Sequence, residues 1–582
     1  MMRRERLSQR IFSGPEPLLV VCLLGISMSV GCMSYIGLPG REKETKTLED
    51  LSDEAPDLVG KYTHPSGMDY VKIEAISLVT GLDGTGEDPA PTPQRAALMA
   101  EINRHNIQHA EQLLASTSTS LVLVRGFLRP GIQEGDRFDV EVRTPTRSET
   151  TSLRGGWLLS ARMTELAVLG QQIRSGHILG VAEGAILVDP SATGEEDEPY
   201  ATRGRVLGGG VAVKSRPMGL VIDDRYKSVQ MATRLAKSIN LRFHTRIEGH
   251  KRGVADPKND EYVEISVHPR YKDNIGRYVR VLQSIAVNET GNQQQQRVLV
   301  LAEQILDPLT AAKAALQLEA LGDAQAIELL QKGMASSDTE VRFYAAEALA
   351  YLDDTSAVEV LAQVARDEPA FRINAMAALS AMDDLEAFNA LYSLLSADSA
   401  ETRYGAFRSL WAMNPHDPAI AGFDMNGSFS YHRLNSVQGP PMVHVTNSLR
   451  PEIVLFGEQP PLKLPLLVEA GSGLIVNGTR NNQLVISRLK RGSEPERRVI
   501  EPEIDELIRT IVELEGTYPD VVQVLQAAKK CGALDSRLRV DALPKPGREY
   551  QRDGEGDDQG EVEEGSHFDL ATPLPDLFKY KS

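Results

Sequence analysis

A repeat of about thirty residues, close to the length of one helical hairpin, is the feature that most limits how this chain can fold. The pattern of residues 341–354 returns at 371–384 and at 402–413, with a fainter copy at 310–323. The copies are rich in alanine and leucine, so paired helices can approach closely and bury their apolar faces against neighbouring hairpins. We therefore expect an α-solenoid over residues 301–415.

The repeat resembles the HEAT family of helical repeats, and an arginine stands near the start of each clear copy. The three are Arg342, Arg372 and Arg403. Two interpretations are open. Each arginine is either a helix-start residue that bonds an adjacent turn, or one rung of a ladder that forms a binding surface.

Strands and helices flank the repeats on both sides. The 582 residues exceed what one core usually supports. Residues 137–143 alternate and place Phe138, Val140 and Val142 on one face, whereas the apolar run 121–127 is typical of a strand buried on both faces. We expect an α+β multidomain fold in which mixed sheet and helix domains are interrupted by the solenoid. Further strands are expected at 70–79, 262–268, 452–457, 465–470 and 537–543, and helices at 94–114, 228–240, 275–285 and, in two pieces, 504–534.

Two glycine-containing blocks carry a family resemblance. Residues 77–86 read SLVTGLDGTG, and residues 131–142 read GIQEGDRFDVEV, followed by SLRGGWLL at 152–159. In this order and spacing they resemble the flagellar P-ring protein family, whose members form a periplasmic ring around the rod of the bacterial flagellar motor. The resemblance runs over residues 70–300 and returns over 416–545, where two helices precede a Cys-Gly pair and a last strand.

This organisation implies that the solenoid is inserted into a P-ring-like protein. We expect the inserted block to be separable, because the flanking parts would supply each other's missing elements. The resemblance also implies a structural subunit that forms a closed ring with itself and contacts the flagellar rod and the outer-membrane ring proteins. The chain departs from the family in its repeats, in its lipoprotein-like start and in lacking a second mature cysteine to pair with Cys531.

The glycines of these blocks are expected to form structural turns, because glycine alone adopts positive φ at no steric cost. They are Gly81, Gly84, Gly86, Gly155 and Gly156. The first three also invite comparison with a phosphate-binding loop. However, no Gly-Lys-Ser/Thr follows, and the acidic residues 87 and 88 would repel phosphate.

The N-terminus has the pattern of an export signal. Residues 1–31 combine four early arginines with an apolar stretch too short to span a bilayer comfortably. Their end, Ser-Val-Gly before Cys32, resembles a lipoprotein cleavage box, so we expect a lipidated Cys32 at the mature N-terminus. Ordinary secretion and a retained anchor are the alternatives. We expect residues 32–69 to be a polar tether and the acidic residues 546–582 to be a disordered tail.

Other chemical motifs are incomplete in the sequence. Asp83, Glu87 and Asp88 could bind Ca²⁺, but no EF-hand ligand ladder is present. His105 and His109 stand one helical turn apart without an evident third zinc ligand. The stretch Gly-Ser-Gly at 471–473 does not complete a Gly-x-Ser-x-Gly elbow.

Cysteine content and charge narrow the function further. Cys531 lies near the end of an amphipathic helix, where we expect a buried structural thiol without a disulfide partner. The net charge of −18 argues against a nucleic-acid partner. We expect no catalytic residue, no metal and no cofactor.

Two non-enzymatic functions follow, with an enzyme of unrecognised type as a third class. The first is a structural subunit of the flagellar basal-body P ring, which supports rotation and motility. It would lie in the periplasm, with the membrane as a partner through a lipid anchor. The alternative is a P-ring-like envelope lipoprotein that uses its solenoid as a docking scaffold for another envelope protein outside the motor.

Overall fold

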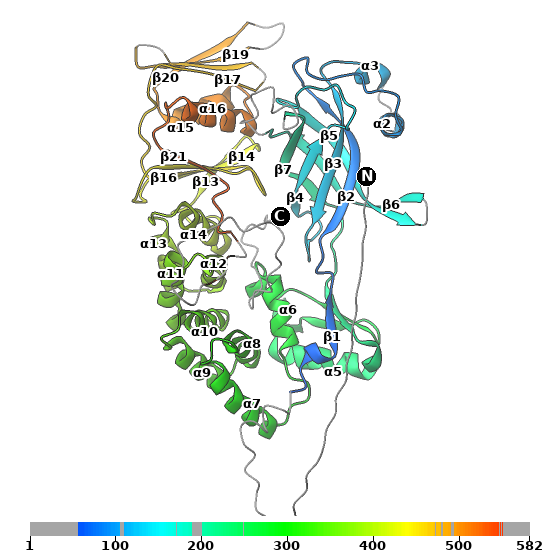
Figure 1. The fold of residues 1–582 in the computed structure, drawn as a ribbon, viewed down its shortest axis with the longest axis vertical. Helices are drawn as coiled ribbons and strands as arrows, with labels where there is room; N and C mark the ends of the chain where they lie inside the picture. Colours follow the sequence, from blue (N-terminus) through cyan, green and yellow to red (C-terminus); the bar gives the residue numbers. More distant parts are fainter. Residues whose placement is uncertain are drawn as a thin grey trace, which may run out of the picture. The chain divides into compact units, whose positions relative to one another are not determined.

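The computed structural model describes residues 56–104, 110–169, 172–188, 201–247, 250–471, 473–478, 481–489, 494–545, 548 and 550. These residues form a closed barrel, a small α/β layer, a stack of helices and a C-terminal sandwich (Figure 1). The predicted α+β multidomain fold with a helical repeat is therefore confirmed.

Strands β2 to β7 close into a barrel in the order β2-β3-β4-β7-β6-β5, and every neighbouring pair is antiparallel. Alternate residues face the apolar interior. On β4, Phe138, Val140 and Val142 are buried between exposed or half-buried neighbours, as the alternation predicted. The strands are β2 (Val71–Thr80), β3 (Ser120–Leu128), β4 (Arg137–Arg143), β5 (Trp157–Leu169), β6 (Gln172–Ala185) and β7 (Arg203–Ala212).

The helices α2 (Pro93–Arg104) and α3 (Ala110–Leu114) lie where a helix over 94–114 was expected, and residues 105–109 between them lie outside the described residues. Leu98 and Leu114 pack against Leu121 on the outside of the barrel. The next residue of β3, Val122, is buried inside the barrel. The expected burial on both faces therefore applies only to the first half of β3, because Phe127 farther along is 44% exposed.

A four-stranded antiparallel sheet in the order β1-β8-β12-β11 forms the α/β layer. Helices α5 and α6 bury their apolar faces in the same core, and both confirm the helices expected at 228–240 and 275–285. The strand expected at 262–268 ends at Ile265. The elements are β1 (Thr63–Ser66), β8 (Gly219–Ile222), η3 (Asp224–Tyr226), α5 (Val229–Arg242), β9 (His244–Ile247), β10 (His250–Gly253), β11 (Ala255–Pro257), β12 (Tyr262–Ile265), η4 (Pro269–Tyr271) and α6 (Ile275–Gln283).

The end of the expected tether is folded, so the boundary at residue 69 is wrong. The helical turn η1 (Val59–Lys61) and strand β1 belong to the α/β layer. Val59 is fully buried, and its N–H donates to the carbonyl of Ile285 at 2.8 Å. The sequence did not predict this strand because Thr63–Ser66 is short and largely polar. The strand is stabilised by its pairing with β8.

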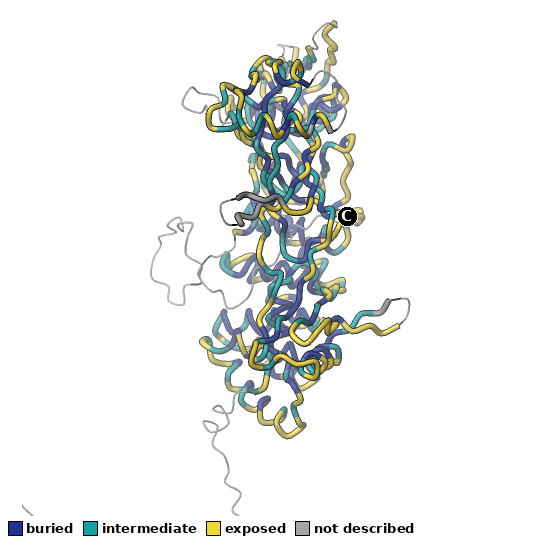
Figure 2. The backbone as a smooth tube through the Cα atoms, turned by 90° about the vertical axis from the view of Figure 1, so that its right-hand side faces the viewer, coloured by how far each residue is buried: buried dark blue, intermediate teal, exposed yellow. Residues whose placement is uncertain are grey.

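A stack of helices follows, and each copy of the repeat forms one buried helix of it. The copies at 310–323, 341–354, 371–384 and 402–413 correspond to α8, α10, α12 and α14, most of whose residues are buried. Figure 2 colours the backbone by burial, with buried residues in dark blue. The helix α7, which precedes the first copy, was not foreseen. The elements are α7 (Gly291–Gln304), α8 (Ala311–Leu321), α9 (Ala324–Met334), α10 (Thr339–Tyr351), η5 (Thr355–Ala357), α11 (Val358–Asp367), α12 (Arg372–Ala381), α13 (Leu385–Leu394) and α14 (Ala400–Met413).

The three recurring arginines bond the turn that precedes their own helix. Arg372 Nε donates to the carbonyl of Ala365 at 2.8 Å, and Arg403 Nε donates to that of Leu395 at 2.9 Å. Arg342 Nη1 donates to the carbonyl of Ser337 at 2.7 Å. Helix ends leave carbonyl groups without partners in the helix. Arg372 and Arg403 satisfy such groups at the ends of α11 and α13, whereas Arg342 bonds carbonyl groups of the loop that follows α9. The helix-start interpretation is therefore confirmed over the binding ladder.

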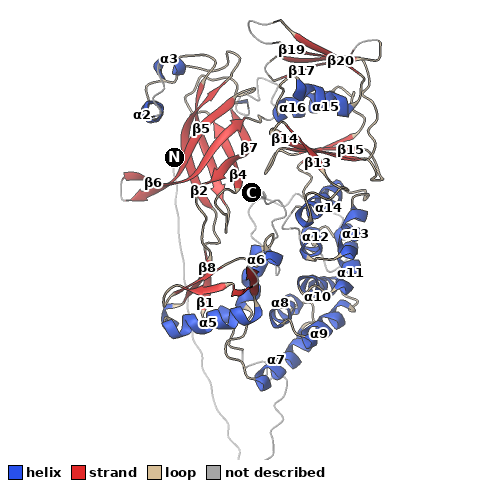
Figure 3. Ribbon diagram, turned by 180° about the vertical axis from the view of Figure 1, so that it is seen from behind, coloured by secondary structure: helices blue, strands red, loops and turns tan. Residues whose placement is uncertain are grey.

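The C-terminal part is a sandwich in which α15 and α16 lie between two sheets (Figure 3). The first sheet has the order β13-β14-β16-β15-β21, and the second has the order β17-β18-β19-β20. The expected strands, the paired helices and the last strand are all present. The elements are β13 (Gly422–Met425), β14 (Phe429–Leu434), β15 (Met442–Val445), β16 (Glu452–Phe456), β17 (Leu466–Ala470), β18 (Leu474–Gly478), β19 (Leu484–Arg488), β20 (Glu496–Ile500), α15 (Ile504–Glu513), α16 (Tyr518–Lys530) and β21 (Arg537–Val540).

The expectation of a buried thiol at Cys531 is wrong, because this free cysteine is exposed. The helix α16 ends at Lys530, and Cys531 caps its C-terminus. Gly532 then turns the chain away with φ of +77°. The helical periodicity of the sequence continues to Cys531, but the helix itself stops one residue earlier.

The boundaries of the apolar cores do not coincide with the domain boundaries that the sequence predicts. The barrel has a core of its own. A second core is continuous from α5 through the repeat helices to β16, and includes Leu235, Leu349 and Phe456. The repeats therefore share their core with the regions on both sides.

Candidate functional site

The predicted glycine turns meet at one end of the barrel. The loop 81–86 lies beside the turn 152–156: Thr85 Oγ1 donates to the carbonyl of Ser152 at 2.8 Å, and Thr151 N–H donates to the carbonyl of Thr85 at 3.0 Å. Gly86 N–H donates to the carbonyl of Thr117 at 2.8 Å. The loop 81–86 of the first block and the turn 152–156 after the second block thus form one hydrogen-bonded unit.

The glycines of this unit are required for two different reasons. Gly81, Gly84 and Gly155 have φ of +79°, +77° and +70°, which side chains rarely adopt. Gly86 and Gly156 lie in ordinary backbone conformations but at close approaches. A Cβ at Gly86 would lie 2.0 Å from the carbonyl oxygen of Thr119, and one at Gly156 would lie 2.5 Å from Val79 Cγ1.

The acidic residues next to this loop bond to protein groups. Glu87 accepts hydrogen bonds from the Ser148 hydroxyl and from the N–H of Glu149, and Asp88 pairs with Arg95. Within the described ranges, no group of three or more His, Cys, Asp or Glu side chains is arranged to hold a metal ion. His105, His109 and Cys32 lie outside the described residues.

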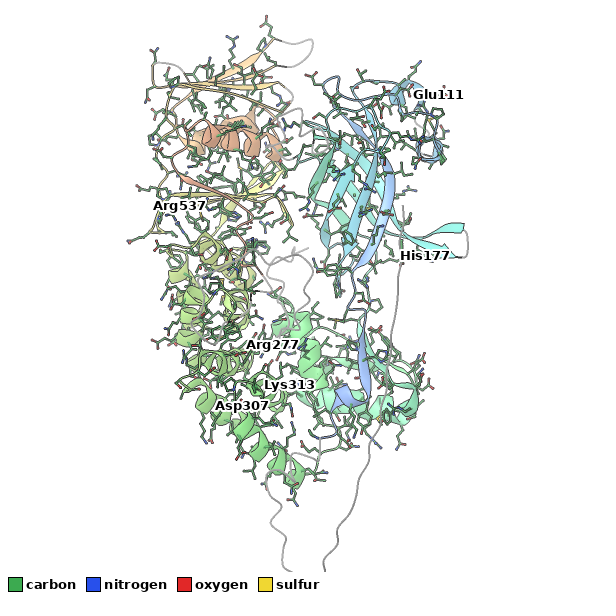
Figure 4. All side chains as sticks on the ribbon, viewed as in Figure 1. Glu111, His177, Arg277, Asp307, Lys313 and Arg537 are labelled. Atoms are coloured by element: carbon green, nitrogen blue, oxygen red, sulfur yellow. The ribbon has the colours of Figure 1, made fainter. Side chains whose placement is uncertain are left out.

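A buried ion cluster joins α6 to the repeat helices. Arg277 of α6, labelled in Figure 4, lies 2.5 Å from Glu319 of α8 and 2.6 Å from Glu347 of α10, and all three side chains are at most 1% exposed. The hydroxyl of Tyr271 donates to Glu319 at 2.6 Å. Burial alone would lower the pKa of Arg277, but the two carboxylates outweigh it and raise that pKa. The cluster ties the repeats to the α/β layer, because removal of one member leaves the others buried without full compensation.

A second buried cluster joins α14 to the C-terminal sheet around Glu452 of β16. Its carboxylate lies 3.0 Å from Arg450 Nη2 and 3.3 Å from Arg408 Nη1, and accepts from the Tyr404 hydroxyl at 2.8 Å. Burial alone would raise the pKa of Glu452, but Arg450 and Arg408 outweigh it and lower that pKa to about 2.

A buried imidazole belongs to the same cluster. The ring of His444 stacks on that of Tyr404 with centroids 3.5 Å apart, and its Nε2 accepts from the N–H of Ala542 at 3.0 Å. Burial lowers the pKa of His444 to about 3, although the charge of Glu452 opposes this shift. His444 is therefore neutral at neutral pH.

The start of the expected disordered tail also contacts the repeats, so the boundary at residue 546 is wrong. Arg548 pairs with Glu401 of α14 through two contacts of 2.9 and 2.8 Å. The ring of Tyr550 packs against that of Phe371, with centroids 5.0 Å apart. The acidic composition of the tail predicted disorder, but Arg548 and Tyr550 each have a partner on the solenoid, namely Glu401 and Phe371.

A cleft of about 390 Å³ lies between η4 and α12. Its lining includes His268 and Ser380. The imidazole Nδ1 of His268 accepts from the N–H of Arg270, and the Ser380 hydroxyl donates to the carbonyl of Ala377 at 2.9 Å. Ser380 is therefore not oriented as a nucleophile activated by His268.

These features define a multidomain protein held together by glycine turns, sheet pairing and buried charge clusters. No described helix is both long enough and apolar enough to cross a membrane. Comparison with protein families gives two matches. Residues 61–304 match the flagellar P-ring protein family, and residues 298–370 match HEAT repeats.

Curated relatives are flagellar P-ring proteins. The protein from Thermotoga maritima is 24% identical over 225 residues, which cover 37% of this chain and 62% of the relative. The one from Nitrosospira multiformis is 27% identical over 244 residues, covering 39% and 59%. The chain thus spans about three fifths of the length of these relatives. The family match ends at residue 304, so the resemblance of residues 416–545 remains a proposal.

Sequence reasoning found the glycine turns and the repeats but missed both buried charge clusters. Arg277, Glu319 and Glu347 look like ordinary charged residues on amphipathic helices. The sequence does contain a signal for burial at Glu319 and Glu347. Each stands on the alanine-rich face of a repeat helix, where an apolar residue is expected.

Proposed function

We propose that this protein is a structural subunit of the flagellar P ring and supports rotation of the motor. One observation carries the proposal: the P-ring match begins at η1 and ends at Gln304, the last residue of α7. The matched sequence therefore covers every strand of the barrel and, from Lys61 onward, the strands and helices of the α/β layer. A ring subunit acts through its interfaces and needs no catalytic group.

The proposed location is the periplasm, in the flagellar basal body, with the rod and the outer-membrane ring as partners. A lipid on Cys32 would attach the ring to the envelope, and firm attachment needs more than one acyl chain. Mass spectrometry of the purified protein is expected to show a lipidated Cys32 as the first residue. An unmodified N-terminus beyond Cys32 would contradict the anchor but not the ring.

Electron microscopy of isolated basal bodies tests the ring itself. With a gold-binding tag after Ser582, label is expected around the rod. Motors without label, with the tagged protein elsewhere in the envelope, would contradict the proposal.

A docking lipoprotein outside the motor is the second candidate, favoured by the repeats. The HEAT match and the helices up to Met413 extend well beyond the P-ring match. Solenoids present extended surfaces for partner proteins. Deleting the gene is expected to abolish motility under the first proposal, whereas motile cells with an envelope defect would favour the second.

A further inference from the structure

The outer sheet of the C-terminal sandwich has two open edges. Its order is β17-β18-β19-β20, and no other described strand pairs with β17 or β20. Strand β20 is exposed along most of its length, with only Ile500 half-buried. Open edges present unpaired backbone N–H and carbonyl groups, which soluble proteins normally shield from other chains.

The two edges carry complementary side chains in matching rows of the sheet. One row runs from Leu467 on β17 through Asn477 and Val485 to Val499 on β20. The next row runs from Glu469 on β17 to Arg497 on β20. Leu467 and Val499 are 69% and 59% exposed. Each row therefore ends in an apolar pair or in opposite charges.

The strand directions also match. Neighbouring strands of this sheet are all antiparallel, so β17 and β20 run in opposite directions. If β17 of a second copy lies beside β20, the antiparallel alternation continues across the joint. The same rows then place Glu469 of the second copy opposite Arg497 of the first, and Leu467 opposite Val499.

We propose that copies of this chain join head to tail by pairing β20 of one copy with β17 of the next. The proposal deepens the proposed ring function and rests on it for the closure of the chain of copies. Main-chain hydrogen bonds supply the contact, and the Glu469–Arg497 pair fixes the register. Because the contact uses two different edges, every copy keeps one edge free for the next copy, and the series ends only when a ring closes.

Cysteine cross-linking tests the contact. Side chains directly opposite in antiparallel strands have Cβ atoms about 4.5–5.5 Å apart, close enough for a disulfide after a small adjustment. In the full-length protein with Cys22→Ser, Cys32→Ser and Cys531→Ser, the pair Leu467→Cys and Val499→Cys is expected to give a ladder of covalent multimers on mild oxidation. Either cysteine alone should give none. Leu467→Cys with Leu385→Cys is a matched control, since Leu385 on α13 is 71% exposed but is not part of the contact.

Charge reversal tests the register. Glu469→Arg or Arg497→Glu is expected to lower the yield of the ladder about fivefold, because like charges then face each other. The two reversals together should restore the yield. Glu328→Arg, the same change at an exposed position of α9, should leave it unchanged.

The outcomes separate this inference from the ring proposal. No ladder, with label still around the rod, would overturn the edge contact and leave the ring function standing. A ladder with motors free of label would support the contact and overturn the motor location. Failure of the double reversal to restore the ladder would overturn the proposed register.

Discussion

The barrel and the repeat helices show two different ways of building a folded region. The barrel closes on itself, pairs all its strands internally and has its own apolar core. The repeats have no core of their own, because theirs continues into the α/β layer on one side and into β16 on the other. Buried charge clusters close both joints. A family boundary in the sequence is therefore not a boundary in packing.

This difference changes the structural role that we assign to the repeats. Their sequence predicts a separable insertion, whereas their contacts make them the link between the matched domain and the C-terminal sandwich. Two tryptophans allow each region to be followed separately, since Trp157 lies on β5 of the barrel and Trp411 on α14. In Trp157→Phe protein the fluorescence reports the repeats, and in Trp411→Phe protein it reports the barrel.

The largest effect is expected from deletion of residues 309–415. The α/β layer and the sandwich should lose their fold, because Arg277 and much of a shared core become exposed. The barrel should persist. Limited proteolysis with mass spectrometry is expected to leave a resistant fragment of about residues 70–213. A deleted protein that is wholly resistant, with a cooperative melt by circular dichroism, would mean that the repeats are separable after all.

Arg277→Met is expected to lower the free energy of unfolding by about 3–5 kcal/mol, because it leaves two buried carboxylates without their cation. Urea denaturation followed through Trp411 measures the change. The matched control is Arg125→Met in the barrel, where Arg125 and Glu74 are 32% and 27% exposed. That loss should be below about 1 kcal/mol. Equal losses at both sites would remove the energetic difference between the two regions.

Acid should weaken the joint around Glu452 before it weakens the barrel. Unfolded histidine takes up a proton near pH 6.5, whereas the folded pKa of His444 is about 3. Between these values the unfolded state binds more protons, so stability falls as the pH falls. Glu452, with a pKa of about 2, adds stability that is present above pH 4.5 and is lost below it.

Between pH 6.5 and 4, we expect a loss of roughly 2–4 kcal/mol at this joint. Urea titrations through Trp411 at each pH measure it, with Trp157 as the internal comparison. His444→Gln should remove most of the dependence above pH 4.5. A barrel that loses stability first on acidification would contradict this order.

Small effects, apart from the Arg125 control, are expected within the barrel at two glycines of one loop. Gly86→Ala should cost about 1–3 kcal/mol, because the new Cβ meets the carbonyl of Thr119. Gly84→Ala meets no atom within 4 Å and strains only φ, so it should cost about 1 kcal/mol. Urea unfolding through Trp157 compares them. A larger loss for Gly84→Ala than for Gly86→Ala would show that the loop relieves the close contact at Gly86 more easily than the strained φ at Gly84.

The sequence correctly predicted the features that depend on residues close together in the chain. It did not predict the features that depend on contacts between residues far apart in the chain. The alternation around Phe138 and the recurrence of Arg372 each specify their surroundings within a few residues, and both were assigned correctly. Strand β1 and residues Arg548 and Tyr550 were assigned to unstructured segments, because their order depends on partners 147 or more positions away. The charge clusters were missed largely for the same reason: the buried Glu452 is stabilised by Arg408 and Tyr404 of α14 in addition to the neighbouring Arg450.

The arginine at each repeat has a consequence for how the solenoid changes in length over evolution. Arg342, Arg372 and Arg403 each bond the turn just before their own helix. Each hairpin therefore contains the arginine that bonds the end of the preceding hairpin. Duplication of one whole period copies both the helix pair and the arginine that connects it to the preceding pair. Gains or losses of a full period preserve the phase of the stack, whereas a half-period change separates an arginine from its turn. The molecule can thus vary the distance that its repeats span in steps of one hairpin while the barrel keeps a fixed size.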